Sequence, residues 1–161
     1  MEPRIEAIAE KKLAGKSLQM TIVQDRTAEL WRSFMPERKK ITNAIGSDLY
    51  SLQVYDAAME FKDFTPQTVF TKWALQEVSN LNEVPEGMLS FVLTGGLYAV
   101  FNYKGRPQDY APTFQYIFSE WMPLSGYEVD KRPHFELLGE KYKNNDPDSE
   151  EEIWVPIKKR I

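Results

Sequence analysis

The chain has 161 residues, a formal net charge of −4, no cysteine and a single histidine, His134. This composition excludes disulfides, thiolate catalysis and any zinc site built from cysteines or from a cluster of histidines. The acidic balance lacks the cationic surface on which nucleic-acid affinity depends, so we expect no direct nucleic-acid binding, and no apolar stretch of about 20 residues predicts a membrane-spanning helix.

The first half of the chain changes from strand to helical periodicity and back. Alternating residues over 4–23 predict one long strand, with or without a bulge at Gly15. Helical spacing over 27–40 predicts a helix, and alternation over 49–55 and 69–78 predicts two further strands. The polar segment 80–87, with Pro85 and Gly87, is the expected connection between two halves.

The second half repeats this order of elements. Strands are expected at 88–94 and 97–104, a helix along the apolar stripe from Tyr110 to Trp121, and strands at 134–142 and 152–158. An antiparallel-rich sheet with both helices on one face would bury the two helical stripes, which is an α+β fold. We therefore expect one domain over 1–161, with halves at about 1–80 and about 88–161.

Glu136 is the most informative polar residue of the sequence. Period two places it on the strand face of His134 and Leu138, with apolar residues on either side along the chain. A strand carboxylate ordinarily faces solvent, because carboxylates are rarely buried without a partner. The alternative is a carboxylate inside a pocket that takes a cation or a polar ligand. The acidic run from Asp146 to Glu152 is interpreted as a solvated loop and strand end.

Aromatic residues of separate strands raise the same question. Trp73, Tyr98, Tyr55 and Trp154 would line a site if they shared the face of Glu136. Aromatic rings around a carboxylate suit an organic cation, through cation–π attraction and the counter-charge. Trp121 lies on a helical stripe, where a core position is the usual outcome. The candidate ligand-binding residues are Glu136, Trp73, Tyr98, Tyr55 and Trp121, and we expect no metal and no cofactor.

Several motifs together resemble the GyrI-like superfamily, which includes effector-binding domains of AraC- and MerR-type regulators. In the second half they are 97–101 with Gly105, 121–128, Phe135-Glu136 and 153–157. In the first half, 30–34, 41–43 and 50–56 are most similar to the stand-alone, integron-cassette-type members. The resemblance extends over nearly the whole chain.

The resemblance implies a duplicated βαββ fold with pseudo-two-fold symmetry and a ligand groove between the halves. It implies that Glu136 is the central carboxylate of an aromatic pocket for lipophilic or cationic ligands, with a link to transcription regulation or to drug and toxin response. The family often has Tyr two residues after this Glu, where this chain has Leu138. The sequence contains no helix-turn-helix segment, so we expect it not to be a complete regulator of the fused kind. The absence of a signal peptide predicts a cytoplasmic protein, and the oligomeric state stays open.

Two other functions remain alternatives. Some superfamily members hydrolyse cyclopropane-bearing compounds, which implies a hydrolase of strained electrophiles with Glu136 as general base. A protein-interaction or sequestration module is the other alternative, and it would present a flat polar face rather than a deep apolar groove. The pattern favours binding and leaves enzymatic activity open.

Overall fold

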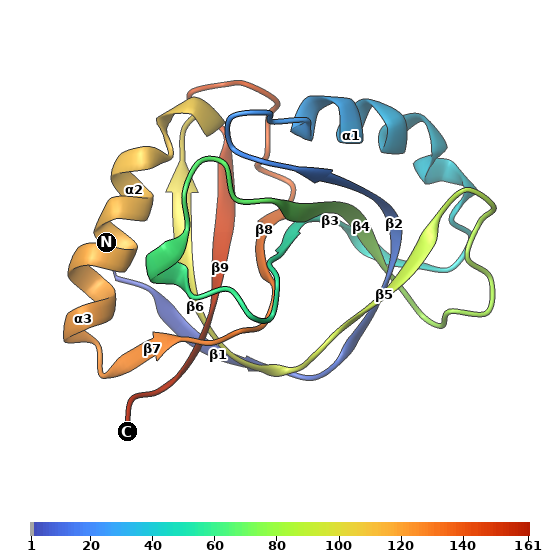
Figure 1. Cartoon of the computed structure of the whole chain (residues 1–161). Helices are drawn as coiled ribbons and strands as arrows, with labels where there is room; N and C mark the ends of the chain where they lie inside the picture. Colours follow the sequence, from blue (N-terminus) through green and yellow to red (C-terminus); the bar gives the residue numbers. More distant parts are fainter. Residues whose placement is uncertain (1) are drawn as a thin grey trace.

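The computed structural model describes residues 2–161 as an α+β fold, with one curled antiparallel sheet and two main helices (Figure 1). The strands are β1 (Arg4–Ile8), β2 (Lys11–Met20), β3 (Ala44–Val54), β4 (Phe70–Val78), β5 (Leu89–Leu93), β6 (Gly96–Lys104), β7 (Tyr127–Val129), β8 (His134–Leu138) and β9 (Glu150–Lys159). Their order in the sheet is β1-β6-β9-β8-β3-β4-β2-β5, and β7 pairs with β9.

The helices follow the predicted apolar stripes. The first is α1 (Thr27–Phe34), extended by the 3-10 segment η1 (Met35–Lys40). The second runs through α2 (Ala111–Tyr116), the π-helical segment η4 (Ile117–Trp121) and α3 (Met122–Leu124). Short 3-10 turns are η2 (Phe61–Asp63) and η3 (Pro107–Asp109). No helix within residues 2–161 is long and apolar enough to cross a membrane.

The expectation of one strand over 4–23 is corrected by the structure. The segment divides into β1 and β2, which pair with β6 and β5 in one unbroken register, Ile8 opposite Gly96 and Lys11 opposite Leu93. The β1–β2 segment and the β5–β6 segment bend together as a two-stranded ribbon along the lower edge of the sheet (Figure 1). Gly95 permits this bend, because a Cβ there would lie 2.5 Å from the carbonyl oxygen of Ile8.

Other predicted boundaries differ at the strand ends. The strand expected at 134–142 ends at Leu138, and the short β7 was not predicted. The strand expected at 152–158 begins earlier, at Glu150. The predicted order strand, helix, strand, strand is therefore also corrected: two strands precede the helix in each half, and two strands follow it in the first half but three in the second. The pseudo-two-fold relation between the halves stays a prediction.

The sheet separates two kinds of core. On the face that we call the helix face, α1 packs Leu30 and Phe34 on Leu49 and Ala74, and the α2 segment packs on its own cluster. That second cluster contains Phe101, Ile117, Met122, Ile153 and Val155. The opposite face holds a separate apolar core of Leu13, Tyr50, Leu52, Leu75, Leu93, Tyr98, Val100, Phe135 and Trp154.

Candidate functional site

A polar strip lies on the helix face between the two helix-bearing clusters. Ser51 pairs with Glu136 and Gln53 with His134 across β3 and β8, so these side chains point to the same side of the sheet. Gln53 is also opposite Lys72 of β4. We call Ser51, Gln53, Lys72, Glu136 and Glu151 the polar floor. Its members come from four neighbouring strands, β4, β3, β8 and β9.

Two carboxylates of the polar floor are buried. Glu136 and Glu151 are each 6% exposed, although carboxylates are among the residues least often buried. Gln53 holds Glu136 from the adjacent strand: in the amide orientation that satisfies its neighbours, its nitrogen donates to Glu136 Oε2 at 3.2 Å. Among residues 2–161, neither carboxylate forms an ion pair within 4.0 Å.

The electrostatics show that these groups act on one another. Burial raises the pKa of Glu151 from 4.5 to about 7, and the charge of Glu136 adds to this effect. Tyr110, through a hydrogen-bonding interaction, and Lys72, through its charge, act on the pKa of Glu151 in the opposite direction. Burial likewise raises the pKa of Tyr55, with the charge of Glu136 contributing.

Aromatic rings surround His134, which shares the strand face of Glu136 beside the polar floor. The ring of His134 lies 5.5 Å from Tyr55, 5.2 Å from Phe61 and 6.5 Å from Phe118, measured between ring centroids. These partners come from the end of β3, from η2 and from η4. Burial lowers the pKa of His134 to about 4, helped by the charge of Arg132, and Nε2 of His134 has no hydrogen-bond partner within residues 2–161.

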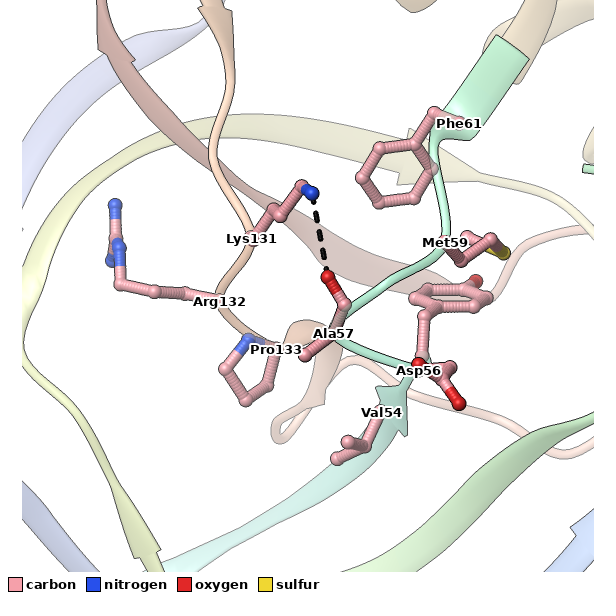
Figure 2. Close-up of a pocket in the computed structure, with 9 residues that line it drawn as sticks. Val54, Asp56, Ala57, Met59, Phe61, Lys131, Arg132 and Pro133 are labelled. Carbon is pink, nitrogen blue, oxygen red and sulfur yellow. Dashed lines mark hydrogen bonds between the residues drawn. The ribbon is translucent and has the colours of Figure 1, made fainter. Parts of the chain in front are cut away.

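The connection between β3 and β4 supplies much of this cover. It passes over the sheet beside α2 (Figure 1). An ion pair of 3.2 Å joins Lys131 to Glu60, and Lys131 Nζ donates to the carbonyl oxygen of Ala57 at 3.3 Å (Figure 2). A cavity of about 60 Å³ remains between this connection and the segment from Lys131 to Pro133. This cavity lies beside the polar floor and is lined by none of its five residues, and four of those five are buried, so the floor is covered in this structure.

The structure brings together only part of the predicted set of ligand-binding residues. Glu136 and Tyr55 meet on the helix face. Trp73 and Tyr98 lie on the opposite face, where Trp73 packs on Phe91 and Tyr98 belongs to the buried core. Trp154 also lies there, stacked on Phe135 with centroids 5.1 Å apart. Trp121 packs on the apolar cluster of the second helix, with its ring 5.3 Å from Phe101 and 6.4 Å from Tyr127.

Sequence reasoning missed Glu151, Lys72, Tyr110 and the rings of Phe61 and Phe118. The interpretation of 146–152 as solvated is wrong for Glu151, because β9 begins at Glu150 and turns the side chain of Glu151 inward. The period-two pattern from Glu151 through Ile153 to Val155 would have revealed this. No cluster of three or more His, Asp or Glu that could hold a metal ion is present within residues 2–161.

A family model described as the GyrI-like small molecule binding domain matches residues 1–158. The chain belongs to this family. The resemblance drawn from the sequence motifs is thereby confirmed. The transcriptional regulator BrlR of Pseudomonas aeruginosa is 27% identical to this GyrI-like domain over 135 residues, which are 83% of this chain and 47% of BrlR. The GyrI-like domain thus spans about half the length of this curated relative.

Solved structures share the fold of the GyrI-like domain at low sequence identity. A structure described as a bacterial transcription regulation protein from Staphylococcus aureus MU50 superposes with a TM-score of 0.70 at 17% identity, covering 98% of this chain and 99% of that one. The structure of SAV2435 bound to tetraphenylphosphonium superposes with a TM-score of 0.66 at 17% identity, covering 98% of this chain and 94% of that one.

Proposed function

We propose that this GyrI-like domain binds lipophilic organic cations over the polar floor, with Glu136 as the counter-charge and Tyr55 as part of the aromatic wall. The observation on which the proposal rests is the burial of Glu136 among aromatic residues without an ion-pair partner within residues 2–161. A buried carboxylate in such surroundings gains from a cation whose apolar groups contact the rings. That SAV2435 is bound to tetraphenylphosphonium supports this class of ligand.

Binding must open the site. A cavity of about 60 Å³ is far smaller than the pockets of about 300–1,000 Å³ that hold drug-sized ligands. The segment between β3 and β4 is the part of the cover that can move, because it leaves the sheet after Val54 and returns at Phe70. We therefore expect the ligand to displace Phe61 from His134 and to take its place against the rings.

The experiment is calorimetric titration of the chain with tetraphenylphosphonium, compared with the neutral triphenylphosphine oxide. Glu136→Gln should weaken binding of the cation by about 1–3 kcal/mol and leave binding of the neutral compound unchanged, since the variant removes a charge-assisted contact. Glu152→Gln is the matched control, because Glu152 lies on β9 and makes an ion pair with Arg4 at 2.9 Å. Equal affinities of wild type and Glu136→Gln for the cation would refute the proposal.

Hydrolysis of a strained electrophile is a second candidate, favoured by one specific observation. Two buried carboxyl groups lie on the same face of the sheet, and the pKa of Glu151, raised to about 7 by burial, keeps a proton on this group near neutral pH. Glu136 would take a proton from the attacking water, and Glu151 would give one to the departing ring carbon. Mass spectrometry of a cyclopropane-bearing compound incubated with the chain tests this. Ring opening that Glu136→Gln abolishes would establish it, and opening no faster than in buffer would exclude it for that compound.

A further inference from the structure

Lys72 is a buried cation that the proposed function does not use. It is 9% exposed and points to the helix face, since it pairs with Gln53 on one side and with Leu18 on the other. Within residues 2–161 it forms no ion pair shorter than 4.0 Å. Burying an ammonium group is costly unless a negative charge compensates for it.

The compensating charge lies across the floor. Lys72 lowers the pKa of Glu151, yet β3 and β8 separate β4 from β9 in the sheet. The ammonium group therefore acts on Glu151 through its charge and not through an ion pair, from a position on β4 opposite Gln53, whose amide donates to Glu136. The covered floor thus contains one positive and two negative side chains.

The charge count sets a limit on the ligand. With Glu136 and Glu151 both ionised, the floor has a net charge of one negative unit, which a single positive charge neutralises. A second positive charge would be buried without compensation, which is unfavourable in a poorly solvated site. We propose that Lys72 determines specificity at this site by making it select organic monocations over dications. This inference rests on the proposed function.

The test compares two fluorescent dyes with one ring system, ethidium with a single positive charge and propidium with two. Titrations at about pH 8 keep Glu151 mostly ionised, since its pKa is about 7. Wild type should bind ethidium more tightly than propidium. In Lys72→Met the two carboxylates can compensate two positive charges, so the ratio of propidium affinity to ethidium affinity should rise at least about ten-fold.

Control variants separate the role of Lys72 from a general effect of charge. Lys72→Arg keeps the charge and should keep the wild-type ratio. Lys16→Met removes a lysine from β2 that instead pairs with Glu37 at 3.1 Å, and it should also leave the ratio unchanged. If Lys72→Met does not fold, Lys72→Met combined with Glu151→Gln removes one charge of each sign. That double variant should then bind both dyes at least about ten-fold more tightly than Glu151→Gln alone.

The outcomes separate failure of the proposed function from failure of the role of Lys72. If wild type binds neither dye nor tetraphenylphosphonium, the proposed function fails. If wild type binds the cations through Glu136 but Lys72→Met leaves the affinity ratio of the dyes unchanged, the function stands and the role of Lys72 is refuted. A weaker affinity for propidium in Lys72→Met would refute that role as well.

Discussion

Glu151→Gln should change how the stability of the protein depends on pH. In the folded protein the pKa of Glu151 is raised from 4.5 to about 7, chiefly by burial. The folded state therefore binds the proton more tightly than the unfolded chain. The stability that protonated Glu151 contributes is fully present below pH 4.5 and is lost as the pH rises through about 7. At about 1.4 kcal/mol per pKa unit, the loss amounts to about 3 kcal/mol.

The glutamine variant cannot titrate at this position. The free energy of unfolding of Glu151→Gln, measured relative to wild type by urea denaturation, should therefore rise by about 3 kcal/mol between about pH 4.5 and about pH 8. Glu152→Gln is the control, since it lies next in the same strand and its carboxylate pairs with Arg4 outside the polar floor. A constant difference between wild type and Glu151→Gln over this range would refute the assignment of a buried, proton-binding Glu151.

Three further predictions concern the same site and its support. The pKa of His134 is lowered from 6.5 to about 4, so the stability that neutral His134 contributes is present above pH 6.5 and is lost as the pH falls through about 4. On acidification over this range, the free energy of unfolding of His134→Leu, measured by urea denaturation, should therefore fall by about 3 kcal/mol less than that of wild type. The affinity for tetraphenylphosphonium, measured by calorimetry, should increase as the pH rises through about 7, where Glu151 ionises. Glu151→Gln should show no such increase. An equal increase in wild type and in Glu151→Gln would contradict a contribution of Glu151 to binding. Gly15→Ala should destabilise the fold by about 3 kcal/mol or more in thermal unfolding, because a Cβ at residue 15 would lie 1.8 Å from the carbonyl oxygen of Ala74. Gly139→Ala is the control, because a Cβ there would lie 3.4 Å from its nearest neighbour.

The kinds of secondary-structure element and most of their positions could be predicted from local sequence patterns. Helical stripes predicted α1 and the α2 segment, because the spacing of apolar residues along a helix depends only on local geometry. The same local rule placed Glu136 on one strand face with His134 and Leu138, as the structure shows. The family motifs were also local, so the GyrI-like resemblance could be drawn before any contact was known.

Which strand faces coincide depends on how the strands pair. A shift of one residue in register moves every side chain of a strand to the other side of the sheet, so the sequence could not tell whether Trp73 and Tyr98 share the face of Glu136. The observed pairing sets both on the opposite face, and it places Lys72 opposite Gln53 and Glu151 on the strand next to that of Glu136. The pKa values depend on the same assembly, since burial is the largest cause of the pKa shift of both Glu151 and His134. The charge balance of the polar floor is therefore a property of the packed sheet, because its members are brought together by four strands that lie far apart along the chain.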